Sequence, residues 1–111
     1  MGIEESNIPI EAAIFFDDEG ETIDYLSYRD PFSTRLLAAH LGIVFQSANA
    51  RLSWLHAGEV DMVEIRATLY DSVTMRVATG CYLSVILKSG ELDHRLLATL
   101  EKVAKELRDE L

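Results

Sequence analysis

The stretch CYLSVIL, residues 81–87, is apolar at nearly every position, and AAIFF, residues 12–16, is apolar throughout. A strand that faces water on one side alternates apolar and polar residues, whereas a strand covered on both faces has no such need. We therefore expect both stretches to be central strands of a sheet with helices on each face.

A third stretch, MVEIRATLY at residues 62–70, alternates strictly. Its apolar and polar residues fall on opposite sides of an extended chain: Val63, Ile65, Ala67 and Leu69 against Glu64, Arg66, Thr68 and Tyr70. The pattern predicts a strand over residues 60–70 with one exposed face, which suits an edge of the sheet.

Short turn signals join these strands into antiparallel hairpins. The acidic segment DDEGE at residues 17–21 contains a glycine suited to a tight turn, and a return strand is expected over Thr22–Tyr28. Asp71-Ser72 and Thr79-Gly80 supply turns on either side of a strand at residues 73–78. Connections this short imply an antiparallel meander.

One long helix is expected between the second and third strands. Asp30-Pro31 is a strong helix start, because aspartate caps free backbone amides and proline suits the first helical position. Gly58 is a candidate C-terminal cap, which gives a helix over residues 31–56. The alternative is a helix that ends near Ala50. Gly42 inside it costs about 1 kcal/mol relative to alanine, and either marks close approach of another backbone or has no structural consequence.

The last segment, ELDHRLLATLEKVAKELRDEL, predicts an amphipathic helix. Its apolar face consists of Leu92, Leu96, Leu100, Val103, Leu107 and Leu111. The predicted order is strand-strand-helix-strand-strand-strand-helix. It gives a single-domain α/β/α sandwich over residues 12–111, with a five-stranded antiparallel sheet and a short segment at residues 1–11.

Composition excludes several classes of function. The 111 residues carry a formal net charge of −9, with 19 acidic residues against 10 basic. That balance disfavours binding to nucleic acid or to anionic membranes. The start lacks the pattern of a signal peptide, no apolar run approaches the ~20 residues of a membrane span, and Cys81 is the only cysteine. We expect a cytoplasmic protein without membrane insertion.

No residue pattern predicts catalysis, a metal site or a cofactor. His40, His56 and His94 are far apart and form no metal-binding motif. Cys81 begins an apolar strand, which is typical of a structural thiol. The acidic DDEGE segment lacks the ligand spacing of a calcium loop. We expect a non-enzymatic protein, so interaction is the remaining class of function.

The predicted edge strand is the candidate interaction site. An edge presents unpaired amides and carbonyls, which need protection or a partner. Glu64 and Arg66 have opposite charges, so in an antiparallel self-pairing each could lie near the other residue of a second copy. A solvated edge with ordinary charges is the alternative.

Three stretches together resemble the Roadblock/dynein light-chain domain family, which includes bacterial and archaeal gliding and polarity regulators. AAIFFDDEGETIDYLS is similar to the first hairpin of the family, and PFSTRLLAAHLGIVFQSANA to its small-residue-rich central helix. The segment from EIRATLYDS to KVAKEL is similar to its meander and closing helix. The resemblance covers about residues 12–110.

The resemblance implies a profilin-like Roadblock topology, and dimers in which the third strands pair across a two-fold axis while the central helices pack side by side. The implied dimer strand is Val60, Met62, Glu64, Arg66 and Thr68, and the implied dimer helix spans Phe32–Leu55. On that helix we favour Leu36, His40 and Ile43 for the interface, whereas Leu37, Leu41 and Val44 fit the core better.

The resemblance also implies a scaffold or regulator of a small Ras-like GTPase, as a homodimer or a heterodimer with a paralogue. The alternatives are a motor light-chain-type interaction domain or a small ligand-sensing domain. Many family members begin with a helix, but the proline in EESNIPIE excludes a long one here. That difference favours a plain scaffold over a GTPase-activating protein.

Overall fold

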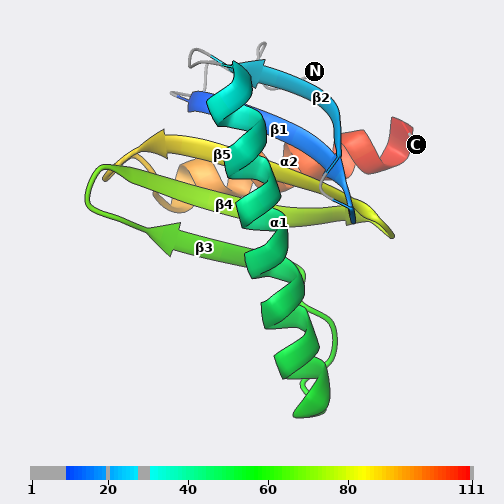
Figure 1. Ribbon diagram of the computed structural model, residues 1–111. Coiled ribbons are helices and arrows are strands. Elements are labelled where there is room, and N and C mark those ends of the chain that lie inside the picture. The colour runs from blue at the N-terminus through cyan, green and yellow to red at the C-terminus, as the bar shows by residue number, and fades with distance from the viewer. Residues whose placement is uncertain (1–9, 20, 28–30, 111) are drawn as a thin grey trace.

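A computed structural model describes residues 10–19, 21–27 and 31–110 of the chain. The predicted order of strands and helices is confirmed (Figure 1). The elements are β1 (Ile10–Asp17), β2 (Thr22–Ser27), α1 (Pro31–Trp54), β3 (Met62–Arg66), β4 (Tyr70–Ala78), β5 (Cys81–Lys88) and α2 (His94–Glu110). Most of the N-terminal segment proposed for residues 1–11 lies outside the described residues.

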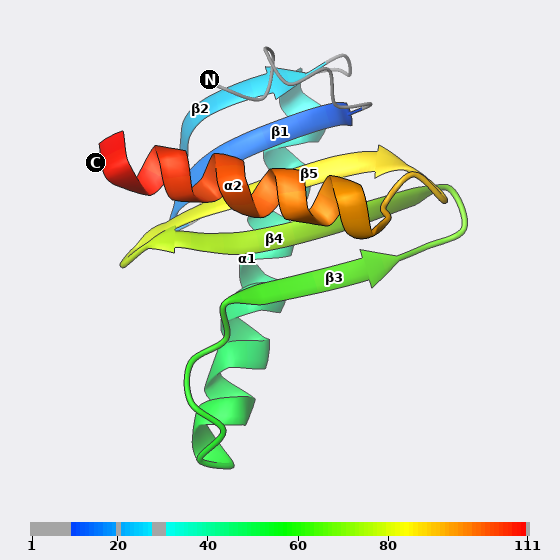
Figure 2. The same cartoon turned by 180° about the vertical axis from the view of Figure 1, so that it is seen from behind.

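The five strands form one antiparallel sheet in the order β2-β1-β5-β4-β3. The two apolar strands, β1 and β5, are therefore neighbours in the centre, and β2 and β3 are the edges. The central positions of β1 and β5 and the edge position of β3 were predicted from the sequence. Helix α1 crosses one face of the sheet, and α2 lies on the other face (Figures 1 and 2). The α/β/α sandwich is confirmed.

Two hydrophobic clusters hold the layers together. Between the sheet and α2 lie alternate residues of the central strands, such as Phe15 and Leu83, with Leu100 of the helix. Between the sheet and α1 lie Phe16 and Ile86, with Phe45 of the helix. The central strands bury both faces, which explains why their sequences do not alternate.

Helix α1 sits close to the sheet because Gly42 has no side chain. A Cβ atom there would lie 3.3 Å from Cε2 of Phe16. The Phe16 ring stacks on Tyr82 at 5.6 Å between centroids, and Phe45 packs on the same tyrosine at 5.0 Å. Of the two possibilities for Gly42, close approach of a backbone or no consequence, neither describes the contact, because the group that approaches is an aromatic ring.

The C-terminal end of α1 differs slightly from the prediction. The helix runs past Ala50 to Trp54, so the shorter alternative is wrong. His56, with φ of 58°, takes the left-handed position that ends the helix, and Gly58, also at positive φ (93°), lies two residues further on. The N–H of His56 donates to the carbonyl of Ser53, and that of Ala57 to Leu52. These bonds form a Schellman cap, in which histidine replaces the usual glycine.

Helix α2 begins and ends with side-chain contacts to the chain. Asp93 caps its start, since Oδ1 accepts a hydrogen bond of 2.8 Å from the N–H of Leu96. Near its end, Nε of Arg108 donates to the carbonyl of Val77 at 2.8 Å. Within residues 10–19, 21–27 and 31–110, no helix has the length and apolarity needed to cross a membrane.

The turn between β3 and β4 lies where the sequence did not predict it. Strand β3 ends at Arg66, and the N–H of Ala67 donates to the carbonyl of Tyr70 across a two-residue turn. The predicted strand over residues 60–70 was therefore too long, and the predicted turn at Asp71-Ser72 was wrong. Both residues belong to β4.

Candidate partner-binding edge

Strand β3 offers a short free edge of three residues. Asp61 accepts a backbone hydrogen bond from Arg76, and Ala67 donates one to Tyr70, so odd-numbered residues point their backbone groups at β4. The even-numbered residues then point theirs outward, and within the strand they are Met62, Glu64 and Arg66. Within residues 10–19, 21–27 and 31–110 nothing pairs with their outward backbone groups, so these three carry the unpaired groups of the edge.

The side chains of β3 alternate between the two faces of the sheet, as predicted. Val63 and Ile65 pack on the cluster under α1, and Met62 packs on the cluster under α2. Glu64 and Arg66 therefore lie on the α2 side. The hydrophobic pattern correctly identified the two faces, although it overestimated the length of the strand.

Two residues predicted for the edge lie outside the strand. Thr68 is in the turn after β3. Val60 precedes β3 and is buried, and its N–H donates to Oδ1 of Asn49 in α1 at 2.8 Å. Since Asn49 takes that N–H, the free edge begins only at Met62.

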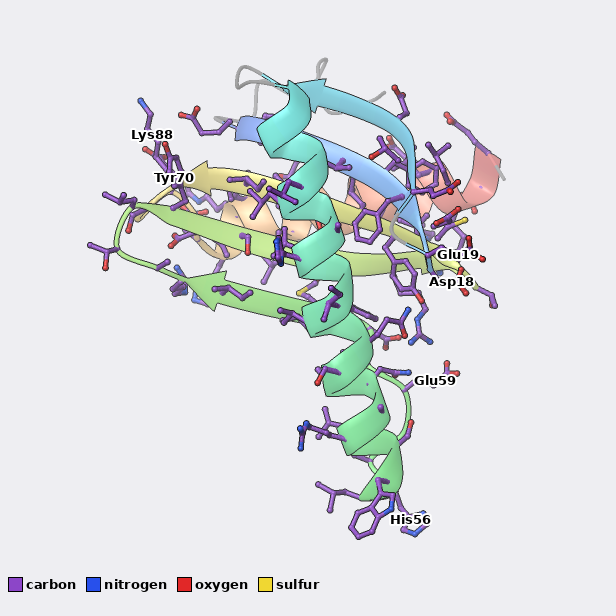
Figure 3. The ribbon with its side chains drawn as sticks, viewed as in Figure 1. Asp18, Glu19, His56, Glu59, Tyr70 and Lys88 are labelled. Atoms are coloured by element: carbon purple, nitrogen blue, oxygen red, sulfur yellow. The ribbon has the colours of Figure 1, made fainter. Side chains whose placement is uncertain are left out.

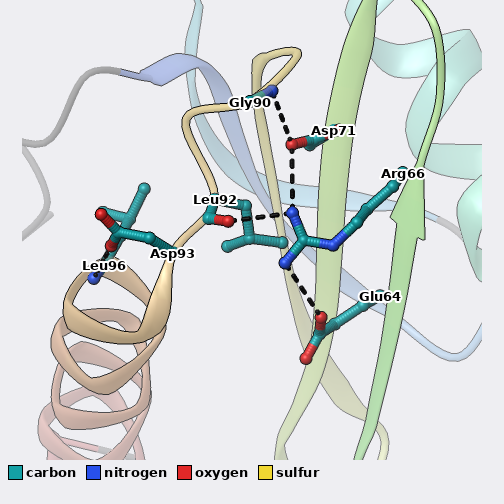
Figure 4. Close-up of polar contacts among 7 residues, drawn as sticks. All are labelled: Glu64, Arg66, Asp71, Gly90, Leu92, Asp93 and Leu96. Atoms are coloured by element: carbon teal, nitrogen blue, oxygen red, sulfur yellow. Dashed lines mark hydrogen bonds and ion pairs between the residues drawn. The ribbon is translucent and has the colours of Figure 1, made fainter.

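Arg66 is tied to its own chain by three contacts (Figure 4). Its guanidinium donates to the carbonyl of Leu92 at 2.9 Å, and it pairs with Asp71 at 3.6 Å and with Glu64 at 3.8 Å. Leu92 and Asp71 lie on different elements, so Arg66 joins the β3 edge to the loop before α2. The side chain is still 56% exposed, which leaves one side of it open.

Asp71 is the buried member of this network. Its side chain is 2% exposed, and Oδ2 accepts a hydrogen bond of 3.0 Å from the N–H of Gly90. A buried carboxylate needs such partners, because water no longer solvates it. Sequence reasoning missed this role, since the partners are 5 and 19 residues away and an Asp-Ser pair is typical of a turn.

Helix α1 presents a second apolar surface near the same edge. Leu36 and Ile43, predicted for an interface, are exposed, and so is His40. Val44 is 42% exposed, so its assignment to the core was wrong. The end of α1 projects beyond β3 (Figure 1), and Trp54 there is 82% exposed.

The acidic segment at residues 17–21 and Cys81 were also considered as sites for metal binding or catalysis. Oδ1 of Asp17 accepts hydrogen bonds from the N–H groups of Glu19 and Glu21, so the acidic segment partly organises its own turn. Among the described residues, no group of three or more His, Cys, Asp and Glu side chains could hold a metal ion. Cys81 is a partly buried free thiol.

The space beneath α1 is too small for a ligand. A cavity lined by Phe16, Phe45, Gln46 and Tyr82 has a volume of about 10 Å³, and Gln46 donates a hydrogen bond to the hydroxyl of Tyr82 within it. That volume holds about one water molecule. A ligand therefore does not fit at this position, whereas a larger open hollow of about 520 Å³ lies between the sheet and α2, lined by Met75, Ala104 and Arg108 among others.

Comparison with known proteins finds the same fold in several solved structures of low sequence identity. No protein-family model matches the sequence, and no curated protein matches it either. Among solved structures, a Roadblock/LC7 domain from Streptomyces avermitilis superposes with a TM-score of 0.86 at 15% identity, over 98% of this chain and 91% of that one.

Two further matches are structures of MglB. The gliding protein MglB from Thermus thermophilus has a TM-score of 0.79 at 10% identity, over 90% of this chain and 76% of that one. A structure described as MglB with tetrameric arrangement has a TM-score of 0.80 at 11% identity, with the same coverage. The chain therefore has the Roadblock/LC7 fold, as the sequence resemblance predicted.

Proposed function

We propose that this protein is a non-enzymatic dimeric regulator that binds a small Ras-like GTPase. The observation that carries the proposal is the free β3 edge beside an α1 helix that is apolar on its exposed side and projects past that edge. Both features expose groups that folding normally covers or protects. The fold shared with MglB, a gliding protein, supports a regulatory role.

The position of α1 decides which flank of the helix would meet a second copy. Asn49 binds Val60, so α1 crosses the edge just before β3 begins. From there β3 runs toward the side of α1 on which Tyr70 lies, away from Asp18 (Figures 1 and 3). A two-fold axis through the middle of β3 would therefore place the second α1 on the Tyr70 side.

Helical geometry assigns residues to that flank. Ala39 and Gly42 line a groove together with Asp18, so they mark the flank that faces away from the second copy. At about 100° per residue, three residues lie roughly half a turn from Gly42. These are Leu37, His40 and Val44. We propose them for the helix–helix contact, together with Trp54 and Leu55 at the projecting end.

The outward side of α1 is the proposed GTPase surface. Leu36 and Ile43 are exposed there, on the face turned away from the sheet. Two-fold pairing would bring the outward faces of both helices side by side and double the apolar surface. An apolar surface of this kind fits a protein partner better than a small polar ligand.

Two measurements, made one after the other, test the proposal. Light scattering at micromolar concentration should give twice the chain mass of 12.4 kDa, and a monomer would refute the dimer. The chain should then bind a Ras-like GTPase from the same genome in a nucleotide-dependent way, measured by calorimetry with GTP-loaded and GDP-loaded protein. Ile43→Asp should abolish that binding and leave the dimer intact, with Lys102→Asp on α2 as the control. Phosphate release would show whether binding accelerates hydrolysis.

A further inference from the structure

The free groups of β3 restrict how two copies can pair. An antiparallel pairing about a two-fold axis normal to the sheet places one residue opposite its own copy. The outward groups belong to Met62, Glu64 and Arg66, so the residue on the axis must be Val63, Glu64 or Ile65 if at least two of the three are to find partners. The proposed dimer thus has three possible registers.

The charges of the edge distinguish these registers. With Glu64 on the axis, all three free positions pair, but Glu64 faces the partner subunit's Glu64, and like charges directly opposite are unfavourable. With Val63 on the axis, Arg66 comes opposite the partner subunit's Val60, whose N–H is already bound to Asn49. With Ile65 on the axis, each Glu64 faces the partner subunit's Arg66.

The network around Arg66 favours the Ile65 register further. The guanidinium is already held by the carbonyl of Leu92 and by buried Asp71, so its position is fixed before any partner arrives. Its contact with Glu64 of the same chain, at 3.8 Å, leaves it open to a second carboxylate. A prepositioned cation loses less conformational entropy on binding.

The other face of the sheet is compatible with the same register. Ile65 is partly buried against the cluster under α1. On the axis it would meet the partner subunit's Ile65 in a non-hydrogen-bonded pair, where Cα atoms approach to about 4.5 Å and side chains are closest. Pairing would therefore bury both isoleucines under the two α1 helices.

We propose that two copies pair through β3 with Ile65 on the two-fold axis, so that Glu64 and Arg66 of both copies close into a ring of four alternating charges on the α2 side of the sheet. The inference rests on the proposed dimer and adds its register. It also gives Arg66 two roles, because the same side chain anchors the edge to the loop before α2 and receives the carboxylate of the second copy.

Single cysteines placed on β3 test the register directly. In a Cys81→Ala background, Val63→Cys, Glu64→Cys and Ile65→Cys are oxidised separately, and disulfide dimers are measured on non-reducing gels. A disulfide needs Cα atoms within about 4.4–6.8 Å, which only the residue on the axis satisfies with its own copy. Ile65→Cys should cross-link at least tenfold faster than the other two. Lys102→Cys, on the outer face of α2, controls for random collision.

The possible results distinguish a wrong register from the absence of a dimer. Faster cross-linking of Val63→Cys would overturn the register, and so would a dimer by light scattering in which none of the three cross-links. Because Glu64→Cys removes the like charges that disfavour Glu64 on the axis, that register is tested with a mixture of Val63→Cys and Ile65→Cys chains, and a mixed disulfide that forms faster than the Ile65→Cys disulfide would also overturn the proposal. A monomer by light scattering would refute the proposed dimer itself. Exchanging the charges of Glu64 and Arg66 is a poorer test of the register, because Arg66→Glu also removes the cation that pairs with buried Asp71.

Discussion

The two helices that cover the sheet differ in how much of their apolar surface the chain uses. Helix α2 has one apolar face, and its buried residues are Leu96, Leu100, Val103 and Ala104. Helix α1 is apolar on several sides, and its exposed large residues are Leu36, Ile43, Val44, Leu52 and Trp54. The apolar face of α2 is therefore buried within one chain, whereas α1 keeps apolar side chains exposed to solvent.

This contrast separates a structural helix from a helix with a second surface. A helix that is apolar all round is normally buried on all sides. Among the residues of α1 whose side chains the structure describes, the buried ones are Leu41 and Phe45, on one narrow side of the helix. The remaining apolar side chains face solvent next to the free edge of the sheet, which is why we place the partner there.

The largest effect should come from the buried side of α1. Phe45 is 1% exposed, whereas Ile43, two residues away, is 66% exposed. Phe45→Ala should lower the free energy of unfolding by about 3–5 kcal/mol, because it removes a large buried ring and leaves a cavity. Ile43→Ala should change it by less than about 0.5 kcal/mol. Urea denaturation at one fixed protein concentration measures both, and equal effects would remove the distinction between the two sides.

The projecting end of α1 should control assembly and not folding. Trp54 and Leu55 are mostly exposed in the single chain, so Trp54→Ser and Leu55→Ser remove little internal packing. In the proposed dimer they bury apolar surface, and the double variant should weaken association by about 2–4 kcal/mol. Analytical ultracentrifugation measures the dissociation constant, and circular dichroism should show an unchanged fold. Lys105→Ser on the outer face of α2 is the control. A dimer as tight as that of the unmodified chain would remove α1 from the interface.

A smaller effect is expected at the β3 edge. Arg66→Ala leaves the buried carboxylate of Asp71 without its cation and the carbonyl of Leu92 without its donor. The free energy of unfolding should fall by about 1–3 kcal/mol. Lys88→Ala is the matched control, because Lys88 pairs with Glu11 at 3.9 Å from an exposed position, where an ion pair contributes at most about 1 kcal/mol. Hydrogen exchange should show faster opening of β3 only in the arginine variant.

The sequence predicted the elements whose signal is local. The unbroken apolar runs of β1 and β5 identified the centre of the sheet, since burial on both faces removes alternation. The single apolar face of α2 identified the side of the helix that packs on the sheet, because apolar residues recur on that one side. Local patterns of two to four residues were sufficient in each case.

The misassigned features depend on residues that are distant in sequence. Asp71 was predicted to be in a turn because its partners, Arg66 and the N–H of Gly90, meet it only in the folded chain. Val44 was placed in the core because apolar residues lie on several sides of α1, so the sequence of the helix does not identify its buried side. The Schellman cap at His56 was assigned to Gly58 because glycine is the usual residue there.

Gly42→Ala should have the smallest effect, and it tests how closely α1 sits on the sheet. Alanine favours a helix by about 1 kcal/mol over glycine. Its Cβ would lie 3.3 Å from Cε2 of Phe16, however, and that ring is buried and stacked on Tyr82, so it has little room to move. The two effects oppose each other, and thermal unfolding should show a net change within about 1 kcal/mol. Gly42→Val adds further bulk against the same ring and should lose about 1–3 kcal/mol. A clear stabilisation by valine would mean that α1 lies further from the sheet than the contact with Phe16 indicates. In that case the narrow buried side of α1, which leaves its other sides free for partners, would have to be reconsidered.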